Sequence, residues 1–156
     1  MKSKLLALAF LVAMTGAASA RTNWVGGVTI LATTAQCTND RHQVGDTYLG
    51  TYQPKNNATI TDNSPSNFLS LTFHRGAFSI KFDALTAGTP YTAVHISGRG
   101  HHNTPTGTIA QMSTTPPTVA ATTQTFVLNA RITNWFNTPG CTATIRAAFV
   151  KFTPVP

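Results

Sequence analysis

Three histidines lie close together in the second half of the sequence. His95 is followed by the adjacent pair His101 and His102, inside a polar stretch between Gly98 and Gly107. Imidazole is the commonest metal ligand in proteins, and a non-extended loop could turn both rings of the pair toward one ion. The sequence therefore offers His95, His101 and His102 as candidate ligands for zinc or copper. Their spacing matches no known zinc signature, so polar histidines on a surface loop are the simpler interpretation.

A second candidate is the short segment that precedes Cys141. Trp135 and Phe136 stand side by side in it, flanked by Asn134 and Asn137. Rigid aromatic faces next to amides suit stacking against sugars or insertion into a pocket of a partner. These four residues are therefore a candidate ligand-binding site. The alternative is that both rings fold inward and close one end of the core, because exposed aromatic pairs are the less usual arrangement.

Groups for acid–base or nucleophilic catalysis are scarce. The chain has only four acidic residues, all of them Asp. A glycosidase needs a matched carboxylate pair, and the G-x-S-x-G elbow of many serine hydrolases is missing. The composition favours a non-catalytic binding or structural module over an enzyme. A metal-binding or hydrolytic protein centred on the three histidines is the alternative.

The first twenty residues have the pattern of a signal peptide. Two lysines precede an apolar run over residues 5–14, and Ala18-Ser19-Ala20 forms an A-x-A cleavage signal. The run is shorter than the roughly 20 residues that a membrane-spanning helix needs. We expect cleavage after Ala20, a single domain over residues 21–156, and a secreted or periplasmic protein of the bacterial envelope or secretome, with no transmembrane segment.

The two cysteines, Cys37 and Cys141, both follow the expected cleavage site. In an oxidising compartment an isolated pair is normally a disulfide. The closed loop would hold on the order of 100 residues, which corresponds to about 4–5 kcal/mol in the chain-entropy model. A redox or metal role is disfavoured because the C-x-x-C spacing is absent.

Basic residues outnumber acidic ones along the whole chain. The formal net charge is +7, and loss of the two leader lysines lowers it by two, to +5. A positive surface favours anionic partners, here anionic or glycan components of an envelope. The basic residues are dispersed in the sequence, whereas nucleic-acid binders usually show a stripe or patch. We therefore expect no nucleic-acid partner.

After the leader, the composition is that of β-strands. Thr is the commonest residue, and Val, Ile, Phe and Tyr recur in short alternating runs that Gly, Pro, Asn and Asp interrupt. The sequence predicts an all-β domain with one disulfide: an antiparallel β-sandwich, or a small partly open barrel, of about eight strands.

The clearest predicted element is a hairpin over residues 67–83. Apolar residues alternate with polar ones on both sides of Arg75-Gly76, where glycine suits a tight turn. A two-residue turn at Arg75-Gly76 pairs the apolar residues as Phe73 with Phe78, Leu71 with Ile80, and Leu69 with Phe82.

Six further strands follow from the same alternation. They are Trp24–Thr34, Thr47–Gln53, Ala58–Thr61, Tyr91–Ser97, Gln124–Thr133 and Cys141–Phe152. In the fourth of these, Val94 and Ile96 are expected to face inward, and Ala93 and His95 outward. The inward positions expected in the fifth are Phe126, Leu128, Ala130 and Ile132, and the residues expected on one face of the sixth are Cys141, Ala143, Ile145, Ala147 and Phe149. Gly26-Gly27 predicts a bulge or a close backbone approach in the first. Residues 98–107 and 113–123 are predicted loops.

Overall fold

Short antiparallel strands account for nearly all of the regular structure. The computed structural model describes residues 21–37, 43–57, 60, 64–73, 76–97, 102–103 and 108–152, so the predicted signal peptide lies outside the described residues. The elements are β1 (Asn23–Thr33), β2 (Thr47–Gln53), β3 (Asn67–Phe73), β4 (Gly76–Phe82), β5 (Pro90–Ser97), β6 (His102–Asn103), β7 (Ile109–Thr115), β8 (Thr125–Thr133), the 3-10 helix η1 (Trp135–Asn137) and β9 (Thr142–Phe152).

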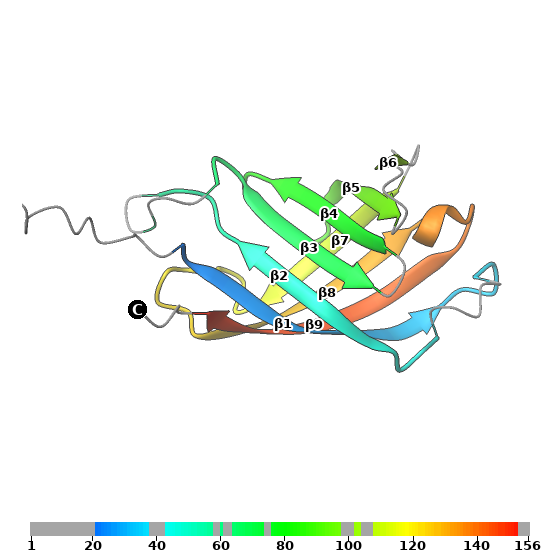
Figure 1. The fold of residues 1–156 in the computed structure, drawn as a ribbon, viewed down its shortest axis with the longest axis horizontal. Helices are drawn as coiled ribbons and strands as arrows, with labels where there is room; N and C mark the ends of the chain where they lie inside the picture. The colour runs from blue at the N-terminus through cyan, green and yellow to red at the C-terminus, as the bar shows by residue number, and fades with distance from the viewer. Residues whose placement is uncertain are drawn as a thin grey trace, which may run out of the picture.

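The strands close into a barrel. Each long strand pairs antiparallel with the next one in the chain, β5 pairs with β7, and β9 returns to pair with β1 (Figure 1). Eight strands form the closed wall, and the two-residue β6 adds to the end of β5. The predicted all-β antiparallel fold is confirmed, and of the two predicted architectures the structure supports the barrel. Closure leaves none of the eight long strands as a free sheet edge.

The core fills the interior of this barrel. Successive side chains on a strand point to opposite faces, so every second residue faces inward. The inward positions of β8 and β9 are the ones that the sequence predicts. They are Phe126, Leu128, Ala130 and Ile132 on β8, and Ala143, Ile145, Ala147 and Phe149 on β9.

The predicted hairpin is formed by β3 and β4, but its register is wrong by two residues. Phe73 lies opposite Gly76, and Leu71 lies opposite Phe78. A shift of two residues keeps every side chain on its face of the sheet, so the apolar pattern could not distinguish the two registers. The positions between the strands, 74 and 75, lie outside the described residues.

The predicted orientation of β5 is also wrong. Ala93 and His95 are buried in the barrel, whereas Val94 and Ile96 are only half-buried. The reason is the pairing with β4, where Phe78 lies opposite His95. Residues directly opposite each other share a face of the sheet, so the inward Phe78 of β4 places His95 inward despite its polarity.

The predicted close approach occurs at Gly26. A Cβ atom there would collide with the backbone carbonyl oxygen of Ala148 on the neighbouring strand β9. The irregularity in the β1–β9 ladder lies further along, between Ile30 and Ala32.

Strand β7 was not predicted, and the predicted loop over 113–123 begins within it. The predicted strand Ala58–Thr61 and the predicted loop over 98–107 lie mostly outside the described residues.

The disulfide joins Cys37, just after β1, to Cys141, just before β9, with an S–S distance of 2.02 Å. The bridge is consistent with an oxidising extracellular compartment. It lies at the end of the barrel that carries η1.

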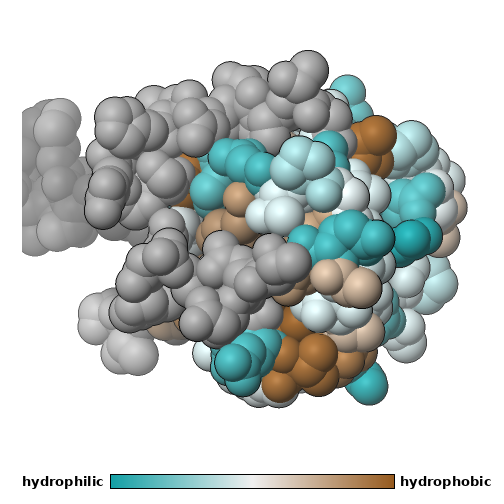
Figure 2. Space-filling model, turned by 90° about the vertical axis from the view of Figure 1, so that its right-hand side faces the viewer, coloured by the Kyte–Doolittle hydropathy of each residue, from teal (hydrophilic) through white to brown (hydrophobic). Residues whose placement is uncertain are grey.

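Figure 2 faces this end of the barrel. Hydrophilic and weakly polar residues cover most of the described surface there, and the largest hydrophobic area lies near the lower edge of the view. In the described residues, no helix is both long and apolar enough to cross a membrane.

Candidate functional site

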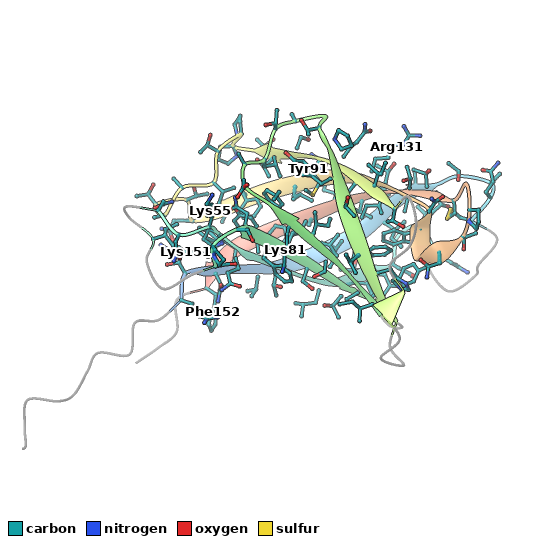
Figure 3. All side chains as sticks on the ribbon, turned by 90° about the horizontal axis from the view of Figure 1, so that it is seen from above. Lys55, Lys81, Tyr91, Arg131, Lys151 and Phe152 are labelled. Atoms are coloured by element: carbon teal, nitrogen blue, oxygen red, sulfur yellow. A yellow bond between two sulfur atoms is a disulfide. The ribbon has the colours of Figure 1, made fainter. Side chains whose placement is uncertain are left out.

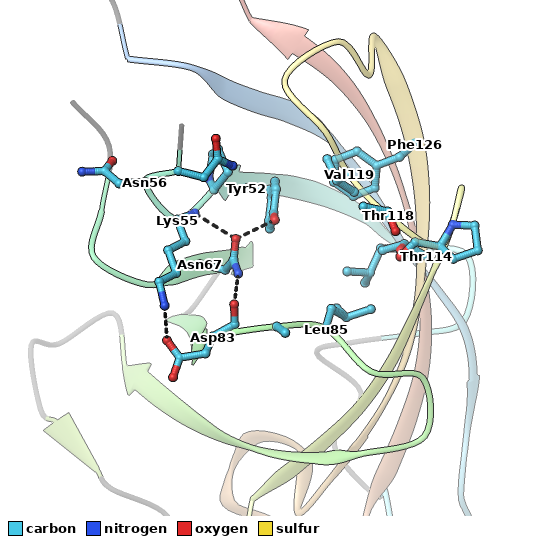
Figure 4. A pocket seen from close by; sticks show the side chains of 15 residues that line it. Tyr52, Lys55, Asn56, Asn67, Asp83, Leu85, Thr114, Thr118, Val119 and Phe126 are labelled. Atoms are coloured by element: carbon cyan, nitrogen blue, oxygen red, sulfur yellow. Dashed lines mark hydrogen bonds and ion pairs between the residues drawn. The ribbon is translucent and has the colours of Figure 1, made fainter. Parts of the chain in front are cut away.

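The two ends of the barrel differ in how they are closed. At the end opposite the disulfide, a cavity of about 360 Å³ opens between the ends of β2, β4 and β7 and the starts of β3 and β8. We call this end the mouth. Lys55 and Lys151 both lie toward it (Figure 3). The side chains around the mouth are drawn in Figure 4. The apolar or aromatic residues among them are Tyr52, Pro54, Ala84, Leu85, Pro117, Val119, Phe126 and Leu128.

Aromatic rings form the inner part of the mouth. The rings of Tyr52 and Phe126 meet edge to face with centroids 5.3 Å apart, and the ring of Trp24 lies 5.7 Å from Tyr52 and 6.2 Å from Phe126. All three side chains are buried against the core. Such edge-to-face pairs are stabilising beyond their area of contact. The cavity therefore has a rigid aromatic floor.

The amide of Asn67 organises the polar side of the mouth. Its Oδ1 accepts hydrogen bonds from the Tyr52 hydroxyl and from the backbone N–H of Lys55, both at 2.9 Å. Its Nδ2 donates to the carbonyl oxygen of Asp83 at 2.8 Å. One side chain at the start of β3 thus ties together the ends of β2 and β4 (Figure 4). The Tyr52 hydroxyl is held in place as a donor and keeps its lone pairs as acceptors.

A salt bridge lies on the rim of the mouth. Lys55 Nζ is 3.0 Å from Asp83 Oδ1, and the two side chains are 45% and 83% exposed. A solvent-exposed ion pair contributes little to stability, at most about 1 kcal/mol. Its effect on the mouth is mainly electrostatic, because the two opposite charges cancel at short range. The two charged residues that line the cavity therefore add no net charge to it.

The segment between β7 and β8 forms one wall of the mouth and is held by residues of β9 and β1, the next two strands after β8 around the barrel. The Trp24 indole donates to the carbonyl oxygen of Thr123 at 3.0 Å. Lys151 donates two hydrogen bonds. Its Nζ donates to the carbonyl oxygen of Ala121 at 2.6 Å, and its backbone N–H donates to the carbonyl oxygen of Gln124 at 2.7 Å. Hydrogen bonds to β1 and β9 therefore hold the wall that carries Val119 in place without a ligand.

The mouth is lined by a mixture of apolar and hydrogen-bonding groups. Burial raises the pKa of Tyr52 to about 12, so its hydroxyl stays neutral at physiological pH. Among the described residues that line the cavity, no histidine or cysteine is present, and the Asp83 carboxylate is paired with Lys55. The lining offers apolar surface and hydrogen-bonding groups, which fix the orientation of a ligand, rather than a matched acid and base.

The predicted aromatic site lies at the opposite end of the barrel. Trp135 is buried, with 3% of its surface exposed, and stacks on Phe78 at a centroid distance of 4.6 Å and an interplanar angle of 16°. Phe136 is half-buried and adopts a left-handed backbone conformation, with φ of 49°. The rings close this end of the core, which is the alternative that the sequence left open. Ligand binding by Asn134, Trp135, Phe136 and Asn137 stays a prediction, but one face of the indole is covered.

The three candidate metal ligands are only partly described. His95 is buried beside the same aromatic rings, and Asn137 Nδ2 lies 3.3 Å from its Nδ1. Burial lowers the pKa of His95, which keeps the ring neutral. His102 belongs to β6, opposite Ile96, and His101 lies outside the described residues. In the ranges that the structure covers, no group of three metal-binding side chains occurs. A zinc or copper site at His95, His101 and His102 stays a prediction.

Comparison with known proteins does not identify a family. No protein-family model matches the chain, and no significant match is found among curated proteins or solved structures.

The mouth itself was not predicted from the sequence. The hydrogen-bonded residues Tyr52, Asn67 and Asp83 come from the ends of three strands. The one signal in the sequence was that each lies where an alternating run begins or stops.

Proposed function

We propose that this protein is a non-catalytic binding protein that holds a small, neutral, partly apolar molecule in the mouth of its barrel. The observation that carries the proposal is the cavity of about 360 Å³ between the aromatic floor and the Asn67 network. Eight-stranded barrels are just wide enough to hold one small ligand, and barrel mouths are among the preferred places for such sites.

The lining narrows the class of ligand. The cavity is near the lower limit of the roughly 300–1,000 Å³ range of ligand pockets, which suits a molecule of one or two rings. One face of that molecule would lie on Tyr52 and Phe126, and its polar groups would turn toward the rim. Because Lys55 and Asp83 compensate each other, the rim favours a neutral ligand with hydroxyl or amide groups over an ion.

The place of action that we propose is outside the cytoplasm. The leader pattern of residues 1–20 supports export, and the Cys37–Cys141 disulfide is in keeping with an oxidising compartment. The protein would then act as a secreted or periplasmic binding module of the envelope or secretome.

The proposal is tested by binding of small neutral compounds to the mature protein. A panel of monosaccharides, aromatic alcohols and cyclic amides is screened by thermal shift, and hits are titrated by tryptophan emission in a Trp135→Phe variant. That variant leaves Trp24 as the reporter, and its ring is next to Tyr52. A bound compound should change the emission and raise the melting temperature.

A matched pair of variants shows whether the mouth is the site. Val119→Arg places a charged side chain into the cavity, and Val44→Arg makes the same change at a 60% exposed position outside it. We expect Val119→Arg to weaken binding by tenfold or more, about 1.4 kcal/mol, and Val44→Arg to leave it unchanged. Equal affinities in the two variants, or no hit from the whole panel, would contradict the proposal.

A further inference from the structure

The outer wall of the barrel carries a cationic face over β7, β8 and β9. Strand pairing places Gln111, Arg131 and Thr144 in one row across the three strands. It places Ser113, Asn129 and Arg146 in the next row. We call these two rows the arginine face. The side chains of Arg131, Arg146, Gln111 and Asn129 are exposed, and those of Ser113 and Thr144 are half-buried.

The two arginines are diagonal neighbours on this face. Arg131 lies opposite Thr144, and Arg146 lies opposite Asn129, so the guanidinium groups start from positions two residues apart on adjacent strands. Diagonal neighbours in an antiparallel pair are roughly 7–8 Å apart. Beside Arg131 the wall is hollowed by a shallow groove of about 280 Å³, which Gln111, Ser113, Asn129 and Thr144 also line. Arg131 points outward from the barrel, away from Lys55 at the mouth (Figure 3).

In the described part of the chain, no Asp or Glu lies on the strands that carry or flank this charge. The last acidic residue in the sequence is Asp83, and β5, β7, β8, β9 and β1, which are consecutive around the wall, contain no Asp or Glu. Among the described residues, neither Arg131 nor Arg146 has an ion-pair partner. Five adjacent strands therefore form a wall of positive sign, on which an anionic partner meets no repulsion.

We infer that the arginine face binds an acidic polysaccharide, one that carries sulfate, phosphate or carboxylate groups between hydroxyl groups. Guanidinium groups pair with such anions in bidentate geometry. The amides of Gln111 and Asn129 and the hydroxyls of Ser113 and Thr144 match the hydroxyl groups of the sugar. The two rows contain no exposed apolar anchor of the kind that would favour a lipid surface. This site is separate from the mouth and does not depend on its proposed function.

The first test shows whether binding depends on the positive charges of Arg131 and Arg146. Binding of the mature protein to dextran sulfate is compared with binding to neutral dextran in two charge-matched variants. Arg131→Gln with Arg146→Gln removes both positive charges from the face, and Arg21→Ser with Lys81→Gln removes the same charge from exposed positions elsewhere. We expect the first variant to lose about tenfold or more in affinity and the second less than about threefold, with a smaller salt dependence only in the first. Equal losses in both, or no binding by the unaltered protein, would overturn the inference.

The second test separates a polysaccharide from other polyanions. Gln111→Ala with Asn129→Ala leaves the charge unchanged but removes both amides. We expect this variant to bind dextran sulfate about threefold to tenfold less tightly, and polyphosphate as well as the unaltered protein does, because only the sugar offers hydroxyl groups. Unchanged binding to dextran sulfate would contradict recognition of the sugar. Tighter binding to vesicles of phosphatidylglycerol than to dextran sulfate would assign the face to a lipid surface instead.

Discussion

At the scale of single residues, His95 stands out because a titratable ring is enclosed by aromatic ones. Its centroid lies 5.2 Å from that of Phe78 and 4.8 Å from that of Phe136. Among the described residues, its Nε2 atom has no hydrogen-bond partner, and any side chain added at Gly76 would press against that atom. A proton on this ring would place a charge in a largely desolvated environment, which is why burial lowers the pKa of His95.

This arrangement predicts acid sensitivity of the fold. The unfolded chain binds a proton at His95 near pH 6.5, whereas the folded chain binds it only at lower pH. The stability that depends on His95 is therefore complete above pH 6.5 and declines as the pH falls below it, by at most about 1.4 kcal/mol per pH unit. Chemical denaturation of the wild type between pH 7.5 and pH 5 should show this decline.

The control is His95→Gln, which has a polar side chain that does not titrate. Its unfolding free energy should change less over the same range, which stays above the usual pKa of the four aspartates. An identical decline in the two proteins would show that another group is responsible.

At the scale of elements, the contact between β1 and β9 is unusually close. Gly26 and Phe149 lie opposite each other in the ladder, and the backbone of β9 at Ala148 occupies the space that a Cβ of Gly26 would need. The next residue, Gly27, has only a methyl group of Thr47 nearby, at 3.6 Å from its would-be Cβ. Two adjacent glycines thus have different physical roles.

We predict opposite effects of the same substitution at these two positions. Gly26→Ala should destabilise the protein by about 1–3 kcal/mol or more, because backbone must move to admit the methyl group. Gly27→Ala should be neutral or stabilise it by about 0.4–1 kcal/mol, because the unfolded chain loses freedom and no contact is strained. Urea denaturation of the two variants measures both changes in unfolding free energy. Similar losses of stability at the two positions would show that the close backbone approach does not set the cost at Gly26.

At the scale of the whole molecule, the first and last strands of the barrel meet. β9 pairs with β1, so the wall closes through residues far apart in sequence. The disulfide crosses the same seam, and its two cysteines are 104 positions apart in the sequence. Such a bridge restricts the unfolded chain more strongly the longer the loop, whereas the folded seam is already held by hydrogen bonds.

Removal of the bridge should therefore weaken the fold without opening the barrel. We expect Cys37→Ala with Cys141→Ala to lower the unfolding free energy by about 2–4 kcal/mol. The far-ultraviolet circular dichroism spectrum should keep its β signature. An unchanged denaturation midpoint, or loss of the β signature in the absence of denaturant, would show that the bridge has another role.

The alternation of side chains determined much of this fold from sequence. Inward positions of β8 and β9 could be predicted because their apolar residues recur with the period of a strand. The same rule failed for β5, where Val94 and Ile96 are apolar but Ala93 and His95 face inward. A strand with apolar residues on both faces contains no signal for its orientation, and its neighbour decides the matter.

The sequence by itself determined most of the strands, the pairing of the two cysteines and the positive charge. Only the tertiary structure decided that the strands close into a barrel, that Trp135 turns inward, and that Tyr52, Asn67 and Asp83 meet at the mouth. The same holds for Arg131 and Arg146, which are dispersed along the chain and adjacent on the wall. The physical reason is that periodicity is a local property, whereas register and closure depend on pairing between strands that are distant in sequence.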